Sequence, residues 1–187
     1  MRQKVIIFLI FGLLLVTTGG LFWFWQNQAD VRALNKTLPQ GVSVAKSLWG
    51  GEYKVVNKID GYSFKIPKAW EGIEEIEYVP EQEIMGLKST GTGIKGSKGT
   101  NTIFSLDIFY LEQEANLLEK ARELWESSGL VGDLIKINVG GFEIVKGSEE
   151  VHLGGTYIYF LKQNKKMYAF NNGSEEFIKE VILNGQW

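Results

Sequence analysis

The sequence predicts an α+β protein in which a mostly antiparallel sheet is sandwiched by helices, preceded by one N-terminal transmembrane helix. Three observations lead to this fold class. Residues 5–25 form an uncharged apolar run. Tight-turn sequences, Asp60-Gly61 and Gly140-Gly141, separate short segments of alternating polarity, which is typical of antiparallel hairpins. Two later segments have apolar residues at helical spacing, and such helices cover the face of a sheet.

The run from Val5 to Trp25 is long enough to cross a membrane. It holds 21 residues without a charge, and a helix of that length spans roughly 31 Å, about one hydrocarbon core. Phe22–Trp25 form an aromatic belt at its far end. Arg2 and Lys4 precede the run, so the positive-inside rule places residues 1–4 in the cytoplasm and the chain after residue 25 outside. The alternative is a cleaved signal peptide, whose apolar region is shorter.

The chain beyond the anchor is expected to form one extracytoplasmic unit. Residues 26–40 are polar with Val31, Leu34 and Leu38 at near-helical spacing, which predicts a short stalk. Residues 41–187 are long enough for a single globular domain with its own core.

Charge and cysteine content exclude several classes of function. Of the 20 Lys and Arg, two precede the apolar run, and the remaining 18 face 22 Asp and Glu, a net charge of −4 outside the membrane. This acidic balance argues against a nucleic-acid partner. The chain has no cysteine, which excludes disulfides, thiol catalysis and a lipidated N-terminal cysteine.

Alternating apolar residues between turn sequences predict the strands. In Asn101–Leu111, the longest, Phe104, Leu106, Ile108 and Tyr110 share one face. The predicted strands are Glu52–Lys58, Tyr62–Ile66, Glu83–Lys88, Asn101–Leu111, Leu134–Val139, Phe142–Lys146, Thr156–Lys162 and Met167–Phe170. The last two are joined by a hairpin turn over residues 163–166.

The helical spacing of apolar residues and the presence of helix-capping residues predict two helices. Glu112–Ser128 has apolar residues at i+3, i+4 and i+7, and Gly129 marks its end. Ser174 is an N-cap for a final helix with acidic residues in its first turn. The side chains expected to pack this last helix on the sheet are Phe177, Ile178, Val181 and Ile182.

The segment Gly61–Trp70, with the sequence GYSFKIPKAW, and the elements after it resemble a known family. A central helix, the Gly140-Gly141 hairpin, the hairpin Thr156–Phe170 and a Ser-Glu-Glu-Phe-Ile helix start at Ser174 follow in order. This resembles the PsbP-like family over roughly Gly41 to Trp187. The resemblance implies an antiparallel sheet sandwiched by helices and a non-catalytic, accessory role. It implies no binding residue.

A glycine-rich segment, Gly91–Gly96, matches the spacing of the dinucleotide fingerprint. That chemistry requires the loop to open a helix, whereas this segment precedes a predicted strand, so no cofactor is expected. We interpret residues 88–100 as a long hairpin loop. Its Lys88, Lys95 and Lys98 are candidates for contact with an anionic partner, such as lipid headgroups or cell-envelope polymer.

An acidic stretch precedes this loop. Solvated surface is its simplest interpretation, and a docking patch for a basic partner or a weak cation site is the alternative. The spacing is not that of an EF-hand, and no metal is expected. The candidate patch consists of Glu74, Glu75, Glu77 and Glu81.

No catalytic constellation is evident. His152 is the only histidine, and no serine near it lies in a nucleophile-elbow context. Four tryptophans could line a sugar-binding face, but core packing is the expected role of Trp49, Trp70, Trp125 and Trp187.

The sequence therefore predicts a single-pass protein of the cell membrane with an extracytoplasmic, non-catalytic interaction domain that binds another envelope protein. The alternative is a binder of a small ligand or an anionic envelope polymer through the Gly/Lys-rich loop 88–100. An enzyme is the third hypothesis and would need a pocket that joins His152 to the glutamates.

Overall fold

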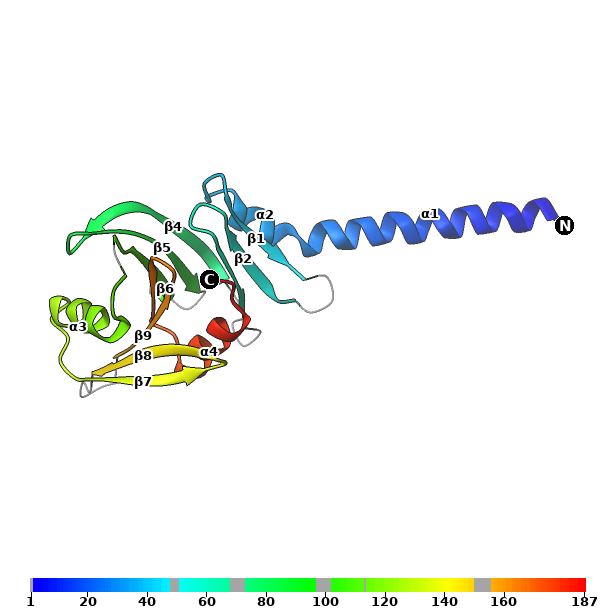
Figure 1. The fold of residues 1–187 in the computed structure, drawn as a ribbon. Coiled ribbons are helices and arrows are strands. Elements are labelled where there is room, and N and C mark those ends of the chain that lie inside the picture. The colour runs from blue at the N-terminus through cyan, green and yellow to red at the C-terminus, as the bar shows by residue number, and fades with distance from the viewer. Residues whose placement is uncertain (1, 48–50, 68–72, 97–101, 113, 150–155) are drawn as a thin grey trace.

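The structure, a computed structural model, describes residues 2–47, 51–67, 73–96, 102–112, 114–149 and 156–187. Within these residues the chain forms a three-stranded and a seven-stranded sheet, and every strand pairing is antiparallel (Figure 1). The predicted α+β class with mostly antiparallel sheets is confirmed. The strand orders are β1-β2-β3 and β4-β5-β6-β10-β9-β8-β7.

The element bounds are as follows. The helices are α1 (Arg2–Asn27), α2 (Ala29–Asn35), α3 (Leu117–Ser127) and α4 (Glu175–Asn184). The strands of the small sheet are β1 (Val42–Lys46), β2 (Tyr53–Asn57) and β3 (Tyr62–Ile66). Those of the large sheet are β4 (Ile73–Ile84), β5 (Leu87–Gly96), β6 (Thr102–Tyr110), β7 (Asp133–Val139), β8 (Phe142–Glu149), β9 (Thr156–Gln163) and β10 (Lys166–Asn171).

The large sheet has a core on each face, as the period-two alternation of β6 predicts. Phe104, Leu106 and Ile108 are fully buried on one face, in a cluster that includes α4 and the small sheet. Phe109 and Leu111 belong to the cluster on the other face, which α3 covers. The four α4 side chains expected to face the sheet are all buried in the first cluster.

An aromatic cluster joins the small sheet to the large one. The ring of Trp187 lies 5.1 Å from Phe170, 6.2 Å from Tyr62 and 6.3 Å from Phe64, centroid to centroid. Trp125 of α3 is buried against the large sheet, so core packing is confirmed for these two tryptophans. Trp49 and Trp70 lie outside the described residues.

The three predicted hairpin turns are confirmed. Gly61, Gly140 and Gly141 have φ values of 74°, 60° and 92°, in the left-handed region that side chains other than glycine adopt at a cost. The turn between β9 and β10 is centred on Asn164, which also has a positive φ of 54°.

One predicted strand is wrong. Glu83–Lys88 is the tip of a long hairpin, because β4 ends at Ile84 and β5 begins at Leu87. Met85 and Gly86 between them have φ values of 53° and 73°. The side chains on both sides of this turn alternate in polarity as they would in one continuous strand, which led to the wrong prediction. Gly86 adopts the left-handed conformation that lets the chain reverse. The strand β1, which the sequence analysis did not predict, completes the small sheet.

The expected stalk, residues 26–40, lies partly within the globular body. Val31 and Leu34 of α2 are buried. The Asn35 side chain accepts from the Val44 backbone N–H and donates to the Val44 carbonyl, each at 2.8 Å. Burial opposes ionisation of Asp30, but hydrogen bonds from Lys46 and Tyr53 hold its pKa below the usual value.

Only Gln28 separates α1 from α2, and backbone hydrogen bonds continue across it. Figure 1 shows α1 as a long rod that leaves the globular part. Among the residues that the structure describes, none of the helices combines the length and the apolar character needed to traverse a bilayer.

A buried carboxylate ties the two sheets together. Asp60, in the β2–β3 turn, is 1% exposed. It accepts hydrogen bonds from Asn57 Nδ2 at 2.6 Å and from the Tyr110 hydroxyl on β6. Lys166 on β10 donates to the Asp60 carbonyl. Burial and the nearby Asp60 charge raise the pKa of Tyr78 on β4 to about 12.

We expect Asp60→Ala to lower the free energy of unfolding of the full chain by about 3 kcal/mol, because Asn57 and Tyr110 lose their buried acceptor. Urea unfolding in detergent micelles measures this change. The matched control is Asp133→Ala, an exposed aspartate at the start of β7, which should shift stability by less than about 0.5 kcal/mol. Equal effects of the two substitutions would contradict the role given to Asp60.

Candidate functional site

The two charged surfaces predicted from the sequence meet on one hairpin. Lys95 on β5 lies 3.2 Å from Glu75 and 3.0 Å from Glu77 on β4. Lys88 lies 2.9 Å from Glu81. Glu74 is exposed on the same strand, and Lys98 lies outside the described residues. The two described candidate cations therefore pair with three of the four candidate glutamates across the β4–β5 ladder, which keeps an excess of negative charge.

The predicted loop over residues 88–100 is wrong as far as Gly96, because this part is strand β5. Thr90 and Thr92 are buried on the face of the sheet that carries Ile94. The intervening Gly91 lies on the other face, where a Cβ would come 3.1 Å from Asp107 Oδ1. Glycine usually weakens a strand, but here its lack of a side chain makes room for Asp107. The segment Gly91–Gly96, which has the spacing of the dinucleotide fingerprint, therefore lies within a strand and opens no helix.

Other sequence candidates are not placed. His152 lies outside the described residues. Across the parts of the chain that are described, the structure shows no group of three His, Cys, Asp or Glu side chains arranged to hold a metal ion.

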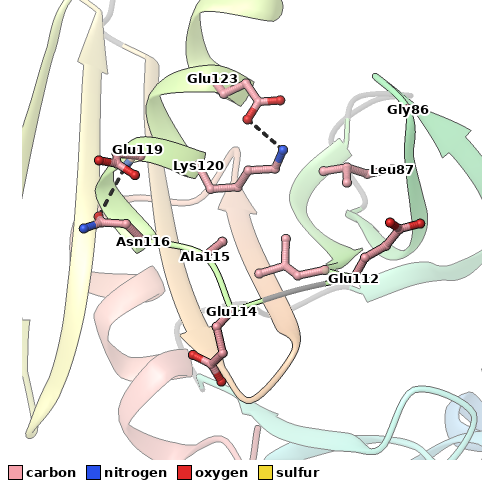
Figure 2. A pocket seen from close by; sticks show the side chains of 10 residues that line it. Gly86, Leu87, Glu112, Glu114, Ala115, Asn116, Glu119, Lys120 and Glu123 are labelled. Carbon is pink, nitrogen blue, oxygen red and sulfur yellow. Dashed lines mark hydrogen bonds and ion pairs between the residues drawn. The ribbon is translucent and has the colours of Figure 1, made fainter.

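A groove lies between α3 and the tip of the β4–β5 hairpin. Its volume is about 490 Å³. Gly86 and Leu87 form one side, and the other side comes from the segment before α3 and its first turns (Figure 2). Four glutamates line this acidic groove, with one lysine among them: Glu112, Glu114, Glu119, Glu123 and Lys120.

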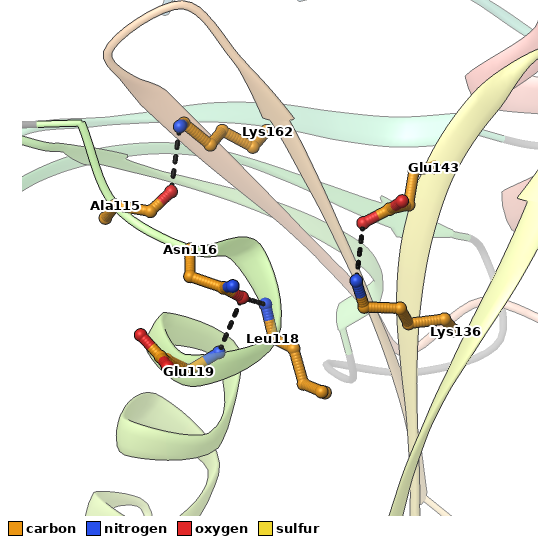
Figure 3. Close-up of polar contacts among 7 residues, drawn as sticks. All are labelled: Ala115, Asn116, Leu118, Glu119, Lys136, Glu143 and Lys162. Atoms are coloured by element: carbon orange, nitrogen blue, oxygen red, sulfur yellow. Dashed lines mark hydrogen bonds and ion pairs between the residues drawn. The ribbon is translucent and has the colours of Figure 1, made fainter.

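The start of α3 shapes the groove. The helix predicted from Glu112 begins at Leu117, because Asn116 caps it. Asn116 Oδ1 accepts from the backbone N–H groups of Leu118 at 2.9 Å and Glu119 at 3.4 Å (Figure 3). An asparagine cap satisfies N–H groups that the first turn leaves without partners. Residues before the cap are therefore non-helical and carry Glu112 and Glu114 to the rim.

Lysines offset only part of the negative charge of the acidic groove. Lys120 lies 2.7 Å from Glu123 (Figure 2). Lys162 on β9 lies 3.1 Å from Glu114 and donates to the Ala115 carbonyl at 2.8 Å (Figure 3). Among the described residues, neither Glu112 nor Glu119 has an ion-pair partner. The neighbouring β7–β8 hairpin is balanced, since Lys136 pairs with Glu143 at 3.0 Å.

This groove was not predictable as a candidate site from the sequence, in which the acidic stretch before β5 has the denser run of glutamates. The available indication was the spacing of Glu119 and Glu123, four residues apart, which places both on one face of a helix. No sequence pattern places the β4–β5 turn opposite that face.

No family model and no curated protein matches the chain. A crystal structure from Bacteroides thetaiotaomicron VPI-5482 is similar at 12% identity with a TM-score of 0.37, over 67% of this chain. The match spans 44% of the length of that chain. The resemblance to the PsbP-like family stays a prediction.

The pairing on the β4–β5 hairpin gives a prediction about anionic polymers. The double variant Lys88→Ser and Lys95→Ser should be retained on a dextran sulfate column no less than the unmodified protein, because both lysines already face carboxylates. The matched control replaces Lys54 and Lys58, two exposed lysines of the small sheet. Strong retention that only the Lys88 and Lys95 double variant loses would restore the anionic-polymer hypothesis.

Proposed function

We propose that this protein is a membrane-anchored, extracytoplasmic interaction domain without catalytic activity, and that its acidic groove docks a basic segment of another envelope protein. The observation that carries the docking hypothesis is the concave surface with two glutamates, Glu112 and Glu119, that have no ion-pair partner among the described residues.

The anchor hypothesis rests on the apolar run and on what α1 exposes. Leu21, Phe22, Trp23, Phe24 and Trp25 are each 46–67% exposed. Exposed apolar surface of this extent in water is unfavourable and typically marks an interaction or membrane site. Burial of α1 in a bilayer, with the aromatic residues at the headgroup level, removes it from water.

The short junction between α1 and α2 supports a domain that stays beside the membrane. The Arg32 guanidinium donates to the Trp25 carbonyl and lies 4.4 Å from the Trp25 ring centroid. Lys46 pairs with Asp30 at 2.7 Å. These contacts hold α2 against both the anchor and β1. Figure 1 shows α3 at the end of the body opposite α1, so the groove beside α3 lies at the end far from the proposed membrane surface.

A basic segment fits the groove by charge. Unpaired carboxylates attract cationic side chains and increase the rate of encounter, and both effects weaken with salt. The alternative, an anionic-polymer binder, is less favoured because Lys88 and Lys95 already have acidic partners.

Membrane topology is testable with single cysteines, since the chain has none. In intact cells, an impermeant maleimide should label the Val131→Cys variant, because the Val131 side chain is 78% exposed. It should label Arg2→Cys only after permeabilisation. The unmodified protein is the control for labelling specificity. A mature chain from which residue 2 is missing would instead show that the apolar run is a cleaved signal peptide.

Docking is testable with an oligolysine peptide and the full chain in detergent micelles. Glu112→Gln with Glu119→Gln should weaken binding about fivefold at low salt, because two exposed charge pairs are lost. The matched control, Glu176→Gln with Glu180→Gln, removes the same charge from α4. Equal weakening by both double variants would mean that only net charge attracts the peptide.

The native partner is testable by photo-crosslinking in the membrane. A crosslinker at Glu119 should capture one stoichiometric envelope protein, and a crosslinker at Glu176 should not. Capture from both positions, or from neither, would contradict docking at the groove.

A further inference from the structure

A second cavity lies under α3, on the same face of the large sheet. Its volume is about 190 Å³. Leu124, Trp125 and Ser128 come from the end of α3, Ile84 and Met85 from the β4–β5 tip, and the rest from the sheet. The sheet residues that line it are Asp107, Phe109, Ile158, Phe160, Ala169 and Asn171.

Small residues create this hollow. Asp107 on β6 is paired in register with Gly91 on β5 and with Ala169 on β10. Neither neighbour fills the space above the sheet beside the Asp107 carboxylate. Another glycine, Gly147, leaves room for the Trp125 ring, because a Cβ at position 147 would lie 2.5 Å from Trp125 Cζ3. The indole Nε1 is on the ring edge opposite Cζ3, and is therefore directed away from Gly147.

Two residues that line the cavity carry buried polar atoms without partners. Asn171 Nδ2 donates to Asp107 Oδ2 at 3.0 Å. Within the described part of the chain, neither Asn171 Oδ1 nor Trp125 Nε1 has a hydrogen-bond partner, although both atoms are buried. Trp125 as a whole is 2% exposed. Buried polar atoms are nearly always hydrogen-bonded in folded proteins, and each exception needs an explanation such as a bound molecule.

The chemistry of the cavity is specific. Asp107 is its one ionisable lining residue among those described, and burial raises the pKa of this carboxyl, an effect that the hydrogen bond from Asn171 offsets only in part. Asp107 and Asn171 Oδ1 both require hydrogen-bond donors, whereas Trp125 Nε1 requires an acceptor. The remaining walls are mainly apolar. This combination of an apolar cavity with a few convergent polar groups is typical of a ligand site.

We propose that this cavity is a binding site for a small amino alcohol, whose ammonium group donates to Asp107 and Asn171 Oδ1 and whose hydroxyl accepts from Trp125 Nε1. The volume corresponds to roughly six water molecules at about 30 Å³ each, which suits a ligand of a few heavy atoms. This site is separate from the acidic groove and does not depend on its function.

The test uses the full chain in detergent micelles and the probe 4-amino-1-butanol. The indole N–H resonances of the six tryptophans are followed by NMR, and Trp125→Phe identifies the signal of Trp125. A saturable shift of the Trp125 resonance in the millimolar range is expected, while the other indole resonances stay in place. Two probes of similar length separate the contacts. Removal of the ammonium in 1,4-butanediol should abolish the shift, and removal of the hydroxyl in n-butylamine should weaken it.

Asp107→Asn should weaken binding of 4-amino-1-butanol at least about tenfold, because the amide keeps the shape but loses the charge. The matched control is Asp133→Asn, which lines the neighbouring cavity on the other side of Trp125 and should bind normally. The five other indole resonances report whether each variant is folded. No saturable shift in the unmodified protein would mean that the cavity holds only water, and equal shifts with 1,4-butanediol would exclude recognition of the ammonium. Either result would overturn the proposal.

Discussion

The buried carboxylate of Asp60 is the contact on which the assembly of the two sheets depends. It lies in a turn of the small sheet, yet its acceptor oxygens bind Tyr110 of the large sheet as well as Asn57 beside it. A buried charge is tolerated only where hydrogen bonds replace the lost water. Because these partners come from both sheets, Asp60 favours one relative placement of the two, and the aromatic cluster around Trp187 packs in the space that this placement leaves.

The shape of the surface distinguishes a structural acidic region from a candidate docking surface. On the β4–β5 hairpin, cross-strand pairs such as Lys95 with Glu77 balance each other, and charged side chains on the edge strand β4 discourage pairing with other chains. Around the start of α3 the glutamates outnumber the lysines, and the surface is concave. Both regions carry more glutamates than lysines, but the glutamates around the start of α3 line a concave surface that a partner segment can enter.

Local features of the fold were predictable from the sequence, whereas the candidate sites were not. The Gly140-Gly141 turn, the Ser174 cap and the alternation along β6 depend on residues a few positions apart, and all three were predicted correctly. The β4–β5 hairpin was missed because its strands carry glutamates and glycines, which disfavour strands by intrinsic propensity. Tertiary pairing outweighs that propensity, since Gly91 makes room for Asp107 and Lys95 compensates the β4 carboxylates.

The sequence by itself determined the apolar run of residues 5–25, the hairpin turns, the cap of the last helix and the absence of cysteine chemistry, because each is a property of adjacent residues. The tertiary structure alone decided which distant groups meet. Lys95 and Glu75 are 20 residues apart, and Asp60 and Tyr110 are 50 apart. Contacts at such separations follow from strand register and sheet packing, which no local pattern encodes. The acidic groove and the cavity at Asp107 arise from those contacts, so both became visible only in the folded chain.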